Sequence, residues 1–355
     1  MKRNILGRVL LSPITLLYSI GVGLRNIFYD SGLLKSTSFN IPVISVGNLS
    51  VGGAGKTPHV EYLIMLLQDY LNVAVLSRGY KRKSKGFKWV NSNDQVTQTG
   101  DEPLQFKRKF PVTSVAVCES RNLGIPMMLQ GKPDIQAMLL DDAFQHRSVV
   151  AGLNILLTTF DEPYTRDYLL PSGRLREFRP SSSRADIIVV TKCPSTIDES
   201  LMQKYRRELN PDKFQKLYFS VYEYADPYYM YNPSMRKKLT RDTKVVLLSA
   251  IANVEYLLDY LDVNAEIVQL LKYEDHHYFK EEEILLLEKI IKEINDPNAI
   301  IITTEKDAMR LDLHRQKIIE SKLPIFALPI KVNFISEKEN NFDESVKDFL
   351  LNFKA

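Results

Sequence analysis

Apolar and polar positions follow two different spacings along the chain from about residue 40 onward. Short apolar runs, typical of buried strands, are separated by stretches whose apolar residues recur every three or four positions, as on one face of a helix. The apolar runs are 41–46, 73–76, 113–117, 137–140, 154–157 and 187–190. The helical stretches are 59–71, 103–109, 121–129 and 199–208. This alternation predicts an α/β fold with a mostly parallel sheet covered by helices on both faces.

The alternation stops between 211 and 238, where six tyrosines and several prolines gather. We interpret this region as strands and turns that link two domains. A second alternating block follows at 245–248, 254–261, 267–271, 281–294, 300–303 and 325–328, and a terminal helix is predicted at 343–353. The expected organisation is an N-terminal helical segment (1–35), a core domain (36–225), a smaller α/β domain (226–335) and a terminal helix (336–355) able to return to the core.

A glycine-rich segment joins the first predicted strand to the first predicted helix: Gly47-Asn48-Leu49-Ser50-Val51-Gly52-Gly53-Ala54-Gly55-Lys56-Thr57-Pro58. Glycines in such a turn let backbone N–H groups close around phosphate oxygens. Lys56 is placed to reach the β- and γ-phosphates, and Thr57 to hold Mg²⁺. Ser50 stands where the generic pattern has its first glycine, but the strand–turn–helix context is the right one. The sequence therefore predicts a P-loop NTPase-type core that binds nucleotide through Gly52, Gly53, Ala54, Gly55, Lys56, Thr57 and Pro58.

Two carboxylates, Asp141 and Asp142, follow the fourth apolar run. In phosphate-loop proteins an aspartate at this place accepts from the Mg²⁺ shell, close to the threonine of the loop. The alternative is a pair of turn-forming aspartates, which the phosphate loop makes less attractive. Gln145 and His146 follow at once and are placed to position nucleotide or substrate.

The turn Gly100-Asp101-Glu102-Pro103 places two carboxylates before a helix, and two interpretations of it stay open. In one, Asp101 caps the helix and Pro103 occupies its first turn. In the other, the carboxylate accepts the proton of a hydroxyl group.

A second unusual cluster is Asp275-His276-His277. Metal binding is disfavoured there, because adjacent residues rarely ligate one ion together, and an Asp–His pair for proton transfer is the better interpretation. Arg78 follows the second strand, and Arg121 begins a helix after the third. Both positions favour a guanidinium that binds phosphate or carboxylate.

Composition and charge narrow the class of protein. Hydrophobic content of 45% and charged content of 25% are those of an ordinary globular chain of 355 residues. The net charge of +4 arises in the first 35 residues, where five basic residues meet one acid, so the rest is close to neutral. This argues against a general nucleic-acid-binding surface and for a local basic patch at the N-terminus. Cys118 and Cys193 lie far apart without metal-type spacing and are expected as free thiols in a reducing compartment.

The basic N-terminus also contains an uncharged apolar stretch from Val9 to Leu24, interrupted by Pro13 and two glycines. It is shorter than the roughly 20 residues that span a bilayer. Three interpretations stay open: a signal peptide, a helix packed on the protein's own core, or a helix in the membrane interface. We favour the interface helix, because its basic residues would meet anionic headgroups and because a nucleotide loop belongs in the cytoplasm.

The motifs occur in the order 47–58, 77–80, 100–103, 141–146 and 275–279. In this order the chain resembles the tetraacyldisaccharide 4'-kinase family, and 170–177 and 303–307 look like further family stretches. That family phosphorylates the 4'-hydroxyl of the lipid A precursor disaccharide. The resemblance implies ATP and Mg²⁺ at Lys56 and Thr57, with Asp141 or Asp142 supporting the metal.

The resemblance also implies that Asp101 acts on the sugar hydroxyl, aided by His276 from the second domain. We expect Asp275 to fix the tautomer of the His276 imidazole. Contacts with substrate are expected from Asn48, Arg78, Glu102, Arg121, Gln145 and His146. The protein is further expected to be a monomer without nucleic-acid partners, bound peripherally to the cytoplasmic face of the inner membrane, with an acylated, phosphorylated disaccharide as substrate.

Two other classes of function stay open from the residues alone. One is a phosphate-loop ATPase or GTPase that acts as a switch or metal chaperone, although Thr191-Lys192-Cys193-Pro194 lacks the aspartate that would read guanine. The other is a binding or scaffolding protein with an inactive nucleotide site. Turnover that depends on the acylated disaccharide separates a kinase from both.

Overall fold

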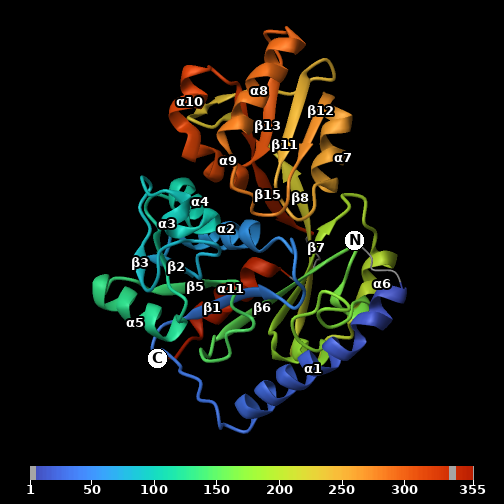
Figure 1. Ribbon diagram of the computed structural model, residues 1–355. Helices are drawn as coiled ribbons and strands as arrows, with labels where there is room; N and C mark the ends of the chain where they lie inside the picture. Colours follow the sequence, from blue (N-terminus) through green and yellow to red (C-terminus); the bar gives the residue numbers. More distant parts are fainter. Residues whose placement is uncertain (1–4, 336–340, 355) are drawn as a thin grey trace.

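The computed structural model describes residues 5–335 and 341–354, which form two units, each built on one β-sheet (Figure 1). In sheet order, the larger sheet contains β15 (Ile330–Phe334), β8 (Lys216–Tyr224), β7 (Ile187–Cys193), β6 (Leu153–Thr159), β1 (Val43–Asn48), β5 (Ala137–Asp141), β2 (Val73–Ser77), β4 (Ser114–Val117) and β3 (Lys88–Trp89). The smaller sheet contains β10 (Asn232–Arg236), β9 (Tyr228–Tyr229), β14 (Ile325–Leu328), β13 (Ile300–Thr304), β11 (Lys244–Ser249) and β12 (Glu266–Lys272). We call the two parts the nine-stranded unit and the six-stranded unit.

The large sheet is mostly parallel. Its strands from β8 to β4 pair in parallel, and the outer strands β15 and β3 are antiparallel. Strands β1, β2, β5 and β7 are buried along their whole length, since both faces of the sheet are covered. This arrangement confirms the predicted fold class.

Helices follow most strands, as the apolar spacing predicts. Those of the nine-stranded unit are α1 (Ile5–Asp30), α2 (Lys56–Leu67), α3 (Val96–Thr99), α4 (Asp101–Lys109), α5 (Arg121–Gly131), α6 (Glu199–Leu209) and α11 (Phe342–Leu351). Those of the six-stranded unit are α7 (Glu255–Asn264), α8 (Glu281–Ile294), α9 (Glu305–Leu311) and α10 (Arg315–Glu320). Short 3-10 turns lie at Tyr164–Arg166, Arg179–Arg184 and Asp312–His314. Helix α2 begins at Lys56, earlier than predicted, because the chain turns into the helix directly at Gly55.

Two adjacent connections join the units. The chain passes from β8 to β9 through 225–227, where the domain boundary is predicted, and it returns from β14 to β15 at Pro329. Ile330 pairs with Tyr224, so the two crossings lie side by side. Strand β15 precedes the predicted boundary at 335, yet it completes the large sheet. Helix α11 then packs its buried residues into the core of the nine-stranded unit.

Helix α1 runs along the outside of the nine-stranded unit (Figure 1). Its exposed large apolar side chains are Val9, Leu10, Ile14, Leu16, Leu17, Ile20, Leu24, Ile27 and Phe28. Polar groups face the protein instead: Thr15 Oγ1 lies 2.7 Å from Ser172 Oγ, and the Tyr18 hydroxyl donates to the Arg176 carbonyl at 2.9 Å. This exposure does not fit a helix whose apolar face packs on the protein's core. Among the residues described, 7–30 form the one helical stretch long and apolar enough to cross a membrane, by length and composition alone.

Candidate active site

The phosphate loop lies at the carboxyl end of β1 and runs directly into α2. Gly52 and Gly55 have φ angles of 115° and 86°, which residues with a Cβ rarely adopt. The loop is also held by the segment around Arg176, whose backbone N–H donates to the Leu49 carbonyl at 2.7 Å. No side chain caps α2 at Gly55, so the first N–H groups of the helix are available to an anion.

Lys56, the first residue of α2, reaches back across the loop. Its Nζ donates to Asn48 Oδ1 at 3.1 Å and lies 3.5 Å from Asp142 Oδ1. Arg176 donates to the same two oxygens, at 2.5 Å and 3.0 Å. Burial opposes ionisation of Asp142, but Lys56 and Arg176 hold its pKa well below its usual range. Arg176 was not predicted as a site residue, and its place in the family stretch 170–177 was the one signal for it.

Asp141 ends β5 in a different environment. Its Oδ2 accepts from the Ser77 hydroxyl at 2.9 Å, and its Oδ1 is buried without a hydrogen-bond partner among the described residues. Burial, together with the carboxylates of Glu102 and Asp142, raises the pKa of Asp141 to about 7. A buried oxygen with unused lone pairs, beside an excess of negative charge, fits the donor chemistry of a divalent cation.

The other predicted contacts lie around the ends of β1, β2 and β5. Arg78 is exposed at the end of β2. Gln145 donates through Nε2 to the Asn48 carbonyl at 3.0 Å. Burial, followed by the positive charges of Arg121 and Arg78, lowers the pKa of His146 to about 4. Its imidazole is therefore neutral at pH 7.

Arg121 does not lie where a ligand would meet it. Its side chain is 1% exposed, and its guanidinium donates to the carbonyls of Cys118 at 3.1 Å and Asp141 at 2.8 Å. We therefore correct the expectation that Arg121 contacts substrate. Its guanidinium holds the end of the strand that carries Asp141.

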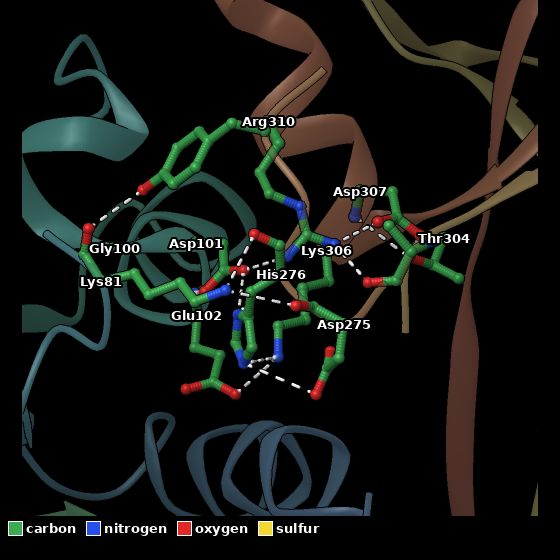
Figure 2. A network of polar contacts seen from close by, with 12 residues as sticks. Lys81, Gly100, Asp101, Glu102, Asp275, His276, Thr304, Lys306, Asp307 and Arg310 are labelled. Atoms are coloured by element: carbon green, nitrogen blue, oxygen red, sulfur yellow. Dashed lines mark hydrogen bonds and ion pairs between the residues drawn. The ribbon is translucent and has the colours of Figure 1, made fainter. Parts of the chain in front are cut away.

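The second cluster lies where the two units meet (Figure 2). Asp101 is the first residue of α4, and His276 belongs to the turn after β12. His276 Nδ1 lies 2.9 Å from Asp101 Oδ2, so the predicted contact across 175 positions is present. The alternative that Asp101 caps α4 is wrong, because the cap residue is Gly100 and Asp101 Oδ1 accepts instead from the Glu102 N–H at 3.0 Å.

Helix α9 of the six-stranded unit adds two cations to this cluster. Lys306 donates to Glu102 Oε1 at 3.0 Å, and Arg310, which is 1% exposed, donates to Asp101 Oδ2 at 2.5 Å. Neither was predicted as a site residue. Lys306 had one signal, its place in the stretch 303–307, and Arg310 had none, because nothing in its neighbourhood on the chain points to Asp101.

Lys306 also bears on the tautomer of the His276 imidazole. Its Nζ, which can only donate, lies 3.3 Å from Nε2, so Nε2 accepts and Nδ1 carries the proton directed at Asp101. Asp275 Oδ2 lies 3.9 Å from Nε2, beyond hydrogen-bond distance. The expectation that Asp275 fixes the tautomer is therefore wrong.

The charge of Asp101 follows from these neighbours. Burial disfavours its carboxylate, but Lys306, the His276 hydrogen bond and Arg310 together hold the pKa of Asp101 well below its usual range. The carboxylate is therefore ionised at neutral pH and able to accept a hydroxyl hydrogen bond, although it is a weaker base than a free aspartate.

Comparisons with known proteins show the family to which the chain belongs. The family model described as Tetraacyldisaccharide-1-P 4'-kinase matches residues 7–350. Tetraacyldisaccharide 4'-kinases of Bacteroides fragilis (strain YCH46) and Flavobacterium johnsoniae are 41% and 42% identical to the chain, over 95% and 97% of its length and 91% and 97% of theirs. A crystal structure of "apo" form LpxK from Aquifex aeolicus in complex with ATP matches with a TM-score of 0.72 at 30% identity, covering 97% of this chain and 99% of that one. The chain therefore belongs to the tetraacyldisaccharide 4'-kinase family, whose members are phosphotransferases acting on a hydroxyl group.

Proposed function

We propose that this protein transfers the γ-phosphoryl group of ATP to the 4'-hydroxyl of a tetraacylated glucosamine disaccharide 1-phosphate, a step of lipid A biosynthesis. One observation carries the proposal: contacts of the segment after β2 connect the Asp101–His276 pair with the strand ends beside the phosphate loop. Ser77, at the end of β2, donates to Asp141 at 2.9 Å, and Gly100, next to Asp101, packs against Gly79. The ATP named in the Aquifex aeolicus complex supports a nucleotide at the loop.

The loop and Lys56 serve the nucleotide. Backbone N–H groups between Gly52 and Thr57, with the Lys56 ammonium, neutralise charge on the β- and γ-phosphates, and this stabilisation grows as charge develops on the transferring group. Asn48 and Asp142 hold the Lys56 ammonium beside the loop.

Thr57 and Asp141 would hold Mg²⁺, since carboxylate and hydroxyl oxygens are the donors that this cation prefers. When bound, it supplies further neutralisation of the phosphate charge. We assign the metal-facing role to Asp141 because both oxygens of Asp142 accept from Arg176, at 3.0 Å and 3.3 Å. Asp141 Oδ1 has no such partner in the described parts of the chain.

Asp101 orients the sugar hydroxyl and takes its proton as transfer proceeds. Phosphoryl transfer through a loose transition state needs alignment more than basicity, so a carboxylate with a lowered pKa is sufficient. His276 and Arg310 hold the same oxygen of Asp101 and thereby fix its direction. Contacts of the substrate with Asn48, Arg78, Glu102, Gln145 and His146 stay predictions.

Helix α1 brings the enzyme to its lipid substrate. Its apolar side chains are exposed while its polar side chains face the protein, the reverse of a helix that packs on a core. Such a face, beside basic residues, fits a helix that lies in the membrane interface. We infer peripheral association of a monomer with the cytoplasmic face of the inner membrane, where ATP is available.

The test is transfer of label from ATP labelled at the γ-phosphate to a tetraacylated glucosamine disaccharide 1-phosphate. Label is expected in the lipid product, and none is expected when the 4'-hydroxyl is blocked by methylation. The Lys56→Ala variant serves as the inactive control. ATP hydrolysis that ignores the disaccharide would instead support a switch-type ATPase.

A further inference from the structure

A second lysine lies beside the phosphate loop, and its charge is not balanced by hydrogen bonds or ion pairs. Lys192, in β7, is 9% exposed and has a left-handed φ of 57°. Among the described residues its ammonium makes no hydrogen bond or ion pair and instead contacts two aromatic rings, those of Tyr222 and Tyr256. Burial lowers its pKa to about 8, against the opposing charges of Asp161, Glu162 and Glu255. An ammonium with unused donors beside a phosphate loop is suited to an anionic ligand.

Two aromatic rings hold the Lys192 ammonium from different units. The Nζ lies 4.5 Å from the ring centre of Tyr256 on α7, and 5.8 Å from that of Tyr222 on β8. Both distances allow a cation–π interaction. The Tyr256 hydroxyl donates to Asp161 of the nine-stranded unit, which ties α7 to the segment after β6.

The ammonium is held against the phosphate loop. A Cβ built on Gly53 would lie 3.8 Å from Lys192 Nζ, and the Tyr222 hydroxyl packs against Gly55. The neighbouring Thr191 hydroxyl donates to the Ala54 carbonyl at 2.9 Å, which fastens the end of β7 to the loop. A phosphate chain bound on this loop would therefore lie beside the Lys192 ammonium.

We propose that Lys192 is a second lysine ligand of the nucleotide's phosphate chain, and that Tyr256 gives the six-stranded unit a part in nucleotide affinity. The inference rests on the proposed function, because it needs a nucleotide at the phosphate loop. An ammonium has three donors and no acceptor, which suits phosphate oxygens.

The experiment compares the dissociation constants of ATP and adenosine for the full chain and three variants. Lys192→Ala is expected to weaken ATP binding about 10- to 100-fold, the range for a hydrogen bond to a charged group, and to leave adenosine binding unchanged. Lys192→Arg is expected to restore most of the affinity for ATP. Lys204→Ala, which removes an exposed lysine on α6, is the matched control and is expected to bind like the natural chain.

The outcomes separate this inference from the proposed function. If the natural chain does not bind ATP, the proposed function fails. If it binds ATP and Lys192→Ala binds equally well, or loses adenosine to the same extent, the phosphate role of Lys192 is overturned. If Lys192→Ala does not fold, Tyr256→Leu and Tyr256→Phe decide: loss of the ring is expected to weaken ATP binding about 3- to 10-fold relative to the phenylalanine variant, and equal binding by the two overturns the inference.

Discussion

Two neighbouring aspartates at the end of β5 show how strongly the pKa of a carboxyl group depends on the groups around it. Asp142 accepts from Arg176 and lies near Lys56, and its pKa is held well below its usual range. Asp141 is buried among other carboxylates, and its pKa rises to about 7. The pKa values of the adjacent carboxyls therefore differ for electrostatic reasons, and the excess of negative charge around Asp141 supports its choice for the metal.

Lys56 faces the loop and not the core, so its removal should affect chemistry more than folding. Lys56→Ala is expected to lower kcat by at least about 100-fold, because the ammonium stabilises charge that develops on the transferring phosphoryl group. The melting temperature of the variant without nucleotide is expected to change little. Turnover and thermal unfolding are the measurements, and a variant that retains most activity would remove the phosphate-loop assignment.

His59 predicts an acid sensitivity of the folded state. It is buried behind the loop, with Nδ1 at 2.8 Å from the Gly55 carbonyl and Nε2 at 3.0 Å from the Ser220 hydroxyl, and burial lowers its pKa to about 4. An unfolded histidine titrates near pH 6.5, so between pH 6.5 and 4 the unfolded chain binds a proton that the folded chain does not. Acidification through this window therefore favours unfolding.

From this residue alone, lowering the pH from 7 to 5 is expected to reduce the free energy of unfolding by about 2 kcal/mol. His59→Asn keeps polar groups at the site but cannot take up the proton. Urea unfolding of both proteins at pH 7 and pH 5 measures the effect. The same pH dependence in the natural chain and the variant would contradict the assignment.

At the scale of elements, α1 differs from every helix that follows the strands. Its spacing places most apolar residues on the outside and polar residues toward 172–176, so its contacts with the protein include hydrogen bonds from Thr15 and Tyr18. Exposed apolar surface of this extent is typical of an interaction site. The element therefore serves attachment more than the stability of the core.

Deletion of residues 1–24 is expected to leave ATP binding intact and to weaken binding to anionic vesicles. Each basic residue near such a surface contributes on the order of 1 kcal/mol, which salt screens, whereas the apolar face is insensitive to salt. High salt should therefore release the full chain only partly. Vesicle sedimentation with and without salt measures this binding. Unfolding of the truncated chain would instead support the interpretation that the helix is needed for the stability of the core.

Single substitutions on α1 refine the test. Leu17 is 70% exposed, so Leu17→Glu is expected to weaken vesicle binding without lowering the melting temperature. Tyr18→Phe on the opposite face removes a hydrogen bond to the Arg176 carbonyl and is expected to leave vesicle binding unchanged. Equal effects of the two variants on vesicle binding would argue against an oriented helix.

At the scale of the whole molecule, the two units meet through a row of charged pairs. Arg108 pairs with Asp312 at 2.7 Å, Lys109 with Glu305 at 2.7 Å and Lys306 with Glu102 at 3.0 Å. These contacts align α4 with α9, the helices that carry Asp101 and Arg310. The arrangement of the units therefore determines whether the candidate catalytic pair exists.

Asp101 and His276 belong to different units, so their coupling tests this arrangement. Asp101→Asn and His276→Ala are each expected to lower kcat by roughly 10²–10⁴, the range for positioned acid–base groups. The double variant is expected to be scarcely worse than the poorer single variant, since groups that act together are not additive. Steady-state kinetics of the three variants provide the measurement, and effects that multiply would show that the residues act separately.

Much of the fold was predictable from local patterns. The strands and helices lie close to the predicted ranges, because the spacings of two and of three to four residues depend only on neighbours along the chain. The helix start at Lys56 and the first position of Asp101 in α4 were missed, since helix ends depend on glycine conformations at 55 and 100. The packing of α1 was left open, because one apolar stretch suits a core and a membrane equally.

The sequence by itself determined the α/β class, the phosphate loop and the family, because each rests on residues that are contiguous or in a recognisable order. Only the tertiary structure decided the partners of the chemical groups: Arg176 at Asp142, Lys306 at His276, and Arg310 at Asp101. It also showed that Arg121 binds the Asp141 carbonyl, and that Lys306 rather than Asp275 lies close enough to His276 to determine its tautomer. The physical reason is that charge state and hydrogen-bond direction depend on burial and on distances of a few ångströms between distant parts of the chain.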